Sequence, residues 1–247
     1  MELKIDKTIH YCWFGGGKKT KLIKKCMKSW KKYCPDYKII EWNESNFDIN
    51  CCKYVNDAYN AKKWAFVSDY ARLWIIYNYG GIYLDTDVEL IKPLENLLTD
   101  AAYFAFEDLN YVNTGLGFGA QKGNQVVKMM LDDYNHINFY KSNGEINYVA
   151  NTFWNTNSIK FLFENLDTSR VIRLSDCTLY PAEYFNPKVF GSDDINITDN
   201  TYSIHHYSLS WAQFGIKDKI KISIKKIVGK KFYNYCKKIK NKFLKKL

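Results

Sequence analysis

The sequence predicts an α/β domain with an open, mostly parallel twisted sheet flanked by helices. Apolar runs of strand length alternate along the chain with helical stretches, and glycine pairs or triplets follow two of these elements. With 247 residues, 47% of them hydrophobic, the chain holds enough apolar material for one sizeable core. Ligands of such sheets bind at the carboxyl ends of the strands.

The first third of the chain contains most of the regular pattern. The expected elements are a strand at Thr8–Phe14 ending in Gly15–Gly17, a basic amphipathic helix at 19–33 stopped before Pro35, a strand at Tyr37–Trp42, a helical stretch at Cys52–Tyr79 ending at Gly80–Gly81, and a buried strand at Ile82–Leu84. Further on we expect strands at Tyr103–Phe106, Leu116–Ala120 and Val171–Leu174, and a helix at Gln125–Tyr134. The Gly15–Gly17 and Asp85–Asp87 segments both follow strands, so we expect them to face one crevice.

Charge divides the chain into two parts. The formal net charge is +10, but residues 217–247 hold 13 Lys and one Asp, whereas residues 1–216 hold 23 basic and 25 acidic side chains. The body, residues 1–216, therefore presents no basic groove, and we expect no nucleic-acid partner. Residues 217–247 form a separate Lys-rich tail.

Cysteine usage and hydropathy indicate a location. The seven cysteines are odd in number and contain no C-x-x-C spacing, which favours a reducing cytosol over a disulfide framework or a zinc site. The N-terminal residues are charged and lack the apolar core of a signal peptide, and no apolar run is long enough to span a bilayer. We expect a cytoplasmic protein.

Asp85 and Asp87 directly follow the predicted strand Ile82–Leu84. Carboxylates two residues apart on an extended segment point the same way, and such close like charges need a cation or a shared proton. Oxygen ligands favour Mg²⁺ or Mn²⁺. The alternative is a solvated loop, because a D-x-D tripeptide is common by chance.

Asp69 and Arg72 lie one helical turn apart within an apolar helix. Charges there are costly unless they are paired. One interpretation is a structural ion pair. The other places both side chains in the crevice, where a carboxylate and a guanidinium hold hydroxyls and a phosphate.

Four segments together resemble the DXD-containing sugar-binding glycosyltransferases. They are Ile9–Gly15, Trp64–Arg72, Tyr79–Asp87 and His205–Trp211, in this order over roughly residues 8–211. That family includes bacterial capsular-polysaccharide transferases and the yeast initiating mannosyltransferase group, and it is distantly related to the glucosylating clostridial toxins. The four linked motifs make the resemblance specific.

The resemblance implies a GT-A fold over residues 1–216 and a role for individual residues. For the donor, the resemblance implies that Trp13 stacks on the nucleotide base beside Phe14 and Gly15, and that Trp211 closes over the phosphates. Asp69 and Arg72 are expected to hold the donor sugar, Tyr83 and Asp85 to lie near ribose and sugar, and Asn113 to lie beside donor and acceptor. The expected ligands of Mn²⁺ or Mg²⁺ are Asp85, Asp87 and His206. His205, which points the other way from His206 in an extended segment, is expected to pack in the fold.

The expected activity is transfer of a hexose from a nucleotide sugar, with a UDP-sugar favoured over a GDP-sugar, to a surface-glycan or lipid-linked acceptor. A divalent cation offsets the charge that develops on a nucleoside diphosphate leaving group. The family implies retention at the anomeric carbon. No residue suggests itself as a covalent nucleophile, so front-face attack by the acceptor hydroxyl is the default.

Two other functions fit parts of the sequence. Leu84–Val88 matches the D-x-D-x-V motif of haloacid-dehalogenase-type phosphatases, and Gly191–Asp194 imitates their late acidic motif, but that motif normally follows the first strand. A non-enzymatic membrane- or polyanion-binding protein would explain only the tail.

The tail, residues 217–247, has an amphipathic pattern. Apolar side chains recur at steps of three to five residues from Ile220 to Phe243, and lysines fall largely between them. One interpretation is a basic helix packed on the body. The preferred one is a helix lying in the plane of an anionic membrane, which places the enzyme peripherally at the inner face of the plasma membrane.

Overall fold

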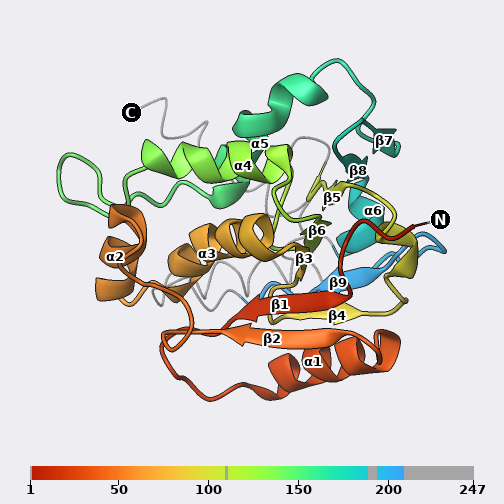
Figure 1. Ribbon diagram of the computed structural model, residues 1–247, viewed down its shortest axis with the longest axis horizontal. Helices are drawn as coiled ribbons and strands as arrows, with labels where there is room; N and C mark the ends of the chain where they lie inside the picture. The colour runs from red at the N-terminus through yellow and green to blue at the C-terminus, as the bar shows by residue number, and fades with distance from the viewer. Residues whose placement is uncertain (1, 109–110, 189–193, 209–247) are drawn as a thin grey trace, which may run out of the picture.

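A computed structural model describes residues 2–108, 111–188 and 194–208 of the chain (Figure 1). Trp211, the domain boundary expected at residue 216 and the tail 217–247 lie outside these residues. Within the described ranges no helix is long and apolar enough to cross a membrane.

The expected mixed α/β fold with a mostly parallel sheet is confirmed. Seven strands form one sheet in the order β2-β1-β3-β6-β5-β8-β7. Strands β2, β1, β3, β5 and β8 run in one direction, because β6 is antiparallel to both of its neighbours and β7 is antiparallel to β8. The strands are β1 (Thr8–Cys12), β2 (Lys38–Trp42), β3 (Gly81–Tyr83), β5 (Ala102–Ala105), β6 (Phe118–Ala120), β7 (Ile172–Arg173) and β8 (Thr178–Tyr180).

A second, two-stranded sheet was not predicted. It pairs β4 (Val88–Leu90) antiparallel with β9 (Ser203–His205), in the register Val88 opposite His205. Both strands have only three residues, too few for a visible alternation of apolar and polar side chains. This sheet brings the late His205–Ser208 segment next to the Asp85–Asp87 segment, 120 residues earlier in the chain.

Helices cover both faces of the main sheet (Figure 1). Helix α3 packs on β1 and β3, α4 on α3, and α5 on α4, while α1 lies on the opposite side against β4. The helices are α1 (Lys21–Tyr33), α2 (Lys53–Asn60), α3 (Trp64–Tyr79), α4 (Gln125–Asp132), α5 (Asn151–Ile159) and α6 (Ala182–Phe185), with 3₁₀ turns at Glu95–Leu97, Asp133–Asn135 and Lys160–Leu162.

The alternation of side chains along the strands separates two hydrophobic cores. On β3, Ile82 joins the core under α1 and α6, whereas Tyr83 joins the core under α3 and α4. On β5, Tyr103 and Phe104 divide in the same way. Burial on both faces explains why these strands read as continuous apolar runs.

The helical stretch expected at 52–79 is two helices, α2 and α3. The chain turns between them because Lys62 adopts a left-handed φ of 55°. The amides of Lys62 and Lys63 donate to the carbonyls of Tyr59 and Ala58, which closes α2. Glycine normally marks such a helix end, and a lysine in its place gives no sequence signal.

Candidate active site

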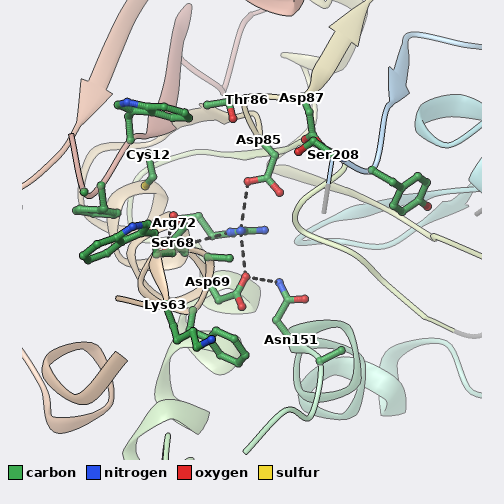
Figure 2. A pocket seen from close by; sticks show the side chains of 18 of the residues that line it. Cys12, Lys63, Ser68, Asp69, Arg72, Asp85, Thr86, Asp87, Asn151 and Ser208 are labelled. Atoms are coloured by element: carbon green, nitrogen blue, oxygen red, sulfur yellow. Dashed lines mark hydrogen bonds and ion pairs between the residues drawn. The ribbon is translucent and has the colours of Figure 1, made fainter. Parts of the chain in front are cut away.

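A cavity of about 600 Å³ opens at the carboxyl ends of β1 and β3 (Figure 2). These strands are parallel neighbours, and the loops that follow them supply Trp13–Gly15 and Asp85–Asp87. The start of α3, the start of α5 and the segment after β9 complete the wall. The expectation that the two strand-end segments face one crevice is confirmed.

Arg72 crosses the cavity wall between two carboxylates. Its side chain is 4% exposed, and Nη2 lies 3.0 Å from Oδ1 of Asp69 and 3.2 Å from Oδ1 of Asp85. Nε donates to the Ser68 carbonyl, which fixes the guanidinium plane. Arg72 and Asp69 are therefore an ion pair and also line the cavity, so both sequence interpretations hold together.

The ionised form of the Asp69 carboxyl is disfavoured by burial. Burial raises the pKa of its carboxyl to about 7, and the positive charge of Arg72 only partly offsets this. Nδ2 of Asn151, in the first turn of α5, donates to Asp69 Oδ1 at 2.9 Å. Asn151 was missed in the sequence, because a single asparagine after an irregular stretch carries no pattern.

Asp87 is held in its ionised form. Burial raises the pKa of this carboxyl, but the charge of His205 and hydrogen bonds from His205 and the Ser208 amide outweigh it and bring the pKa well below its usual value. His205 Nε2 lies 3.2 Å from Asp87 Oδ1, and the Ser208 amide donates to Oδ2 at 2.6 Å. Burial lowers the pKa of His205, but the neighbouring Asp87 raises it above its ordinary value.

Asp85, Asp87 and His205 form a group that could hold a metal ion. Each offers one ligand atom, and these atoms lie within 4.8 Å of one another. Nδ1 of His205 is buried and has no hydrogen-bond partner among the described residues. A pair of carboxylates with an imidazole suits Mn²⁺ or Mg²⁺, so the residues fit the expected ion.

The structure places His205, and not the predicted ligand His206, beside the two aspartates. His206 Nε2 lies 2.7 Å from Glu89 Oε2, which also pairs with Lys25 away from the cavity. Consecutive residues of an extended segment point in opposite directions, and β9 turns His205 toward the aspartates. The sequence predicted the alternation, but it expected His205 to pack in the fold and His206 to face the aspartates.

Two other expected residues support the wall from behind. Tyr83 is 1% exposed and is not among the residues that line the cavity, whereas the resemblance placed it near ribose and sugar. Its hydroxyl donates to Asp85 Oδ1 at 3.0 Å and its ring packs on Arg72. Asn113 does line the cavity, and its Oδ1 accepts from the Gly115 amide. A Cβ on Gly115 would lie 2.6 Å from Asp85 Oδ2, so only glycine fits there.

The Trp13–Gly15 segment lines the far side of the cavity. Trp13 is half-buried, its indole N–H donates to the Gly17 carbonyl at 2.8 Å, and Lys19 lies over its ring. Phe14 is buried against Phe47 and contributes mainly to the core. Gly15 has a φ of 80°, and a Cβ there would lie 2.4 Å from the Trp64 ring.

Comparison with known proteins confirms the resemblance noted in the sequence. Residues 20–104 match the family described as "Glycosyltransferase sugar-binding region containing DXD motif". Inositol phosphoceramide mannosyltransferase 1 of Schizosaccharomyces pombe (strain 972 / ATCC 24843) is 32% identical over 80 residues, which is 32% of this chain. The match spans only 24% of that relative's length.

Two solved glycosyltransferases have a similar structure. One is titled "PaToxG Glycosyltransferase", with a TM-score of 0.50 and 20% identity over 67% of this chain and 72% of the other. A glycosyltransferase involved in glycosylation of the major capsid of PBCV-1 has a TM-score of 0.48 and 14% identity over 88% of this chain and 99% of the other. The first likeness confirms the glycosyltransferase-type fold.

These findings support the glycosyltransferase interpretation over its two rivals. The D-x-D motif follows β3, the third strand along the chain, instead of the first strand that the phosphatase motif requires. Most of Gly191–Asp194 lies outside the described residues. A purely membrane- or polyanion-binding protein would leave the buried Asp69–Arg72–Asp85 arrangement without a role.

Proposed function

We propose that this chain is a metal-dependent, retaining glycosyltransferase that moves a hexose from a nucleotide sugar to a glycan or lipid-linked acceptor. The convergence of Asp85, Asp87 and His205 beside the Asp69–Arg72 pair supports this most directly. One end of the cavity suits a metal-bound diphosphate, and the adjoining wall offers groups that bind sugar hydroxyls. The sugar–phosphate bond to be broken lies between them.

The residues that would hold the cation are Asp85, Asp87 and His205. A divalent ion bound there neutralises the charge that develops on the departing diphosphate. Asp87 contributes a full negative charge, because its low pKa keeps it ionised. Arg72 is fixed by Asp69, Asp85 and Ser68 before any ligand arrives, so its charge needs no reorganisation.

Asp69 and Asn151 are suited to the sugar. Asp69 Oδ1 is already engaged by Arg72 and Asn151, and its Oδ2, which has no hydrogen bond with the described residues, is proposed to accept from a hydroxyl. For a retaining reaction, the acceptor oxygen bonds to the anomeric carbon on the face that the diphosphate leaves. The acceptor proton passes to the departing diphosphate oxygen, so the protein supplies no nucleophile.

The nucleotide is proposed to lie against Trp13. The half-buried indole at the cavity edge offers a face for a base, and its N–H is already bonded to Gly17. We favour a uridine nucleotide over a guanosine one, although the metal-binding residues suit either diphosphate. Trp211, proposed to close over the phosphates, lies outside the described residues.

The Lys-rich tail is proposed to hold the enzyme at the inner face of the plasma membrane. Each of its 13 lysines contributes about 1 kcal/mol near an anionic surface at low salt. Deleting residues 217–247 is expected to abolish binding to phosphatidylserine vesicles while transfer to a soluble acceptor survives. Vesicle binding unchanged by the deletion would contradict this assignment.

The function is tested by binding of nucleotide sugars to the full chain. We expect UDP- or GDP-sugars to raise the melting temperature in the presence of Mn²⁺, and to do so much less with EDTA. Release of nucleoside diphosphate from the stabilising donor then measures turnover. If no nucleotide sugar stabilises the protein with Mn²⁺ present, the proposal is wrong.

A further inference from the structure

Lys63 is a buried cation that the proposed reaction leaves without a role. It directly precedes α3, is 8% exposed as a residue and lines the cavity. Its backbone is fixed, because its amide donates to the Ala58 carbonyl and its own carbonyl accepts from the Phe66 amide. Within the described ranges, its ammonium has no hydrogen bond or ion pair. The ammonium is not among the fully buried atoms, so it reaches the cavity, where it can pair with the anion of a ligand.

The surroundings of Lys63 add positive potential. Lys62, the preceding residue, and Lys18 also line the cavity. Helix α3 begins here with no side-chain cap and no acidic residue in its first turn. The amino end of a helix carries partial positive charge and normally attracts a carboxylate, yet this one is flanked by lysines. The arrangement destabilises the free protein and favours a bound anion.

The nearest carboxylate of the cavity wall does not neutralise Lys63. Asp69 is paired with Arg72 and accepts from Asn151. Figure 2 shows Lys63 on the Asp69 side of Arg72, with Asp85 and Asp87 on the other side. A diphosphate held at the metal-binding group therefore lies across Arg72 from Lys63. An anion at Lys63 belongs to a different part of the substrates than the diphosphate.

The cavity mouth beside Lys63 is apolar. Tyr148 is 56% exposed and lines the cavity together with Val149, and its ring packs against Phe66, close along the chain to Lys63. Exposed large apolar side chains at a cavity edge mark a contact surface for a ligand. The ligand suited to this end combines an anionic group with a less polar portion.

We propose that Lys63, assisted by Lys62 and the amino end of α3, binds a phosphate group carried by the acceptor. This inference rests on the proposed glycosyltransferase function, which places the donor diphosphate at the metal end. Two adjacent lysines and a helix terminus match a phosphate better than a singly charged carboxylate. The phosphate would hold the acceptor so that its hydroxyl reaches the sugar beside Asp69.

The test uses the full chain and phenyl phosphate as the probe, with binding followed by calorimetry. We expect it to bind in EDTA, and to bind equally well when Mn²⁺ and UDP are saturating. Lys63→Met is expected to weaken binding by about tenfold or more, because a charge-assisted hydrogen bond is lost. Lys63→Arg should retain most of the affinity. Lys53→Met, which removes a lysine of α2 outside the cavity, should leave it unchanged.

The inference would be overturned if phenyl phosphate does not bind, if UDP with Mn²⁺ displaces it, or if Lys63→Met binds it equally well. Tighter binding of benzoate would also overturn it, since it would indicate a carboxylate-bearing acceptor. Displacement of the probe by glucose 6-phosphate would assign a glycan phosphate, and displacement by short-chain phosphatidic acid would assign a lipid phosphate. If neither compound displaces the probe, the proposal of an acceptor phosphate is contradicted.

Folding is controlled in the same samples. Lys63→Met is expected to match the melting temperature of the wild-type chain, because the ammonium makes no hydrogen bond or ion pair with the described residues; a large decrease would indicate a structural role instead. Binding of UDP with Mn²⁺ is measured alongside. If UDP binds but phenyl phosphate does not, the inference fails and the proposed function stands. If phenyl phosphate binds at Lys63 but no nucleotide binds, the proposed function fails.

Discussion

Asp87 and Asp69 lie in one cavity, and both are largely buried, yet their environments oppose each other. At the strand end of the cavity, formed by Asp85, Asp87 and His205, the His205 side chain and the Ser208 amide hold the pKa of Asp87 below its usual value. At the helix end of the cavity, formed by the starts of α3 and α5, burial raises the pKa of Asp69 to about 7 despite the positive charge of Arg72. Asp87 thus retains a charge ready for a cation, whereas Asp69 carries a charge that the protein barely stabilises. This difference indicates separate partners for the two carboxylates.

The strongest test of this difference is to neutralise each aspartate separately. Asp87→Asn is expected to lower Mn²⁺-supported UDP affinity by about a hundredfold or more, because a charged ligand is removed. Asp69→Asn should leave that affinity within about threefold while transfer falls by about a hundredfold, because its partner is the sugar. Titration calorimetry and donor turnover measure the two effects. Equal losses of UDP binding in both variants would contradict the division.

A second experiment tests which histidine belongs to the strand end. His205→Ala is expected to weaken Mn²⁺ binding by about tenfold to a hundredfold. His206→Ala is its matched control: it breaks the partly buried pair with Glu89, which lies away from the cavity, and should leave Mn²⁺ affinity unchanged. Mn²⁺ affinity is measured by electron paramagnetic resonance. A larger loss in His206→Ala would restore the original assignment of His206.

The strand end was largely predictable from the sequence and the helix end was not. Asp85 and Asp87 follow a short buried strand, and the position of a strand end determines where such residues lie. The choice between His205 and His206 depended on the pairing of β9 with β4, which three-residue strands do not reveal. Asn151 is positioned by the start of α5, and Lys63 by the turn at Lys62 between α2 and α3. Neither position is marked by a sequence pattern. Tyr83 matched a motif, but the pleat of β3 turned it behind Asp85.

A third experiment alters the wall that supports the strand end without removing a ligand. In Gly115→Ala the new Cβ would lie 2.6 Å from Asp85 Oδ2 and 3.0 Å from Arg72 Nη1, so both groups must shift. We expect Mn²⁺ affinity to fall by about three- to tenfold, and stability by about 1–3 kcal/mol. Gly17→Ala is the control, because nothing lies within 4 Å of its Cβ position. Unchanged Mn²⁺ binding in Gly115→Ala would show that the position of Asp85 is unimportant for the ion.

The smallest expected effect is a pH dependence of stability that belongs to the helix end. Burial raises the pKa of Asp69 from 3.8 to about 7 in the folded protein. The native state then binds a proton that the unfolded chain has already released, so the wild-type loses stability as pH rises from about 4 to about 7. Asp69→Asn cannot ionise and should not show this loss. Its urea midpoint is therefore expected to rise relative to the wild-type across that range.

The control for this effect has the opposite sign. The hydrogen bond from Lys7 lowers the pKa of the exposed Asp36, so its contribution is present above pH 3.8 and is lost as pH falls. The midpoint of Asp36→Asn should therefore fall relative to the wild-type as pH rises toward 3.8 and change little above it, while that of Asp69→Asn rises between about pH 4 and about pH 7. Because every other titrating group is common to the three proteins, its effect cancels in these differences. Parallel trends for both variants would show that Asp69 is stabilised as an anion by Arg72, and the contrast with Asp87 would disappear.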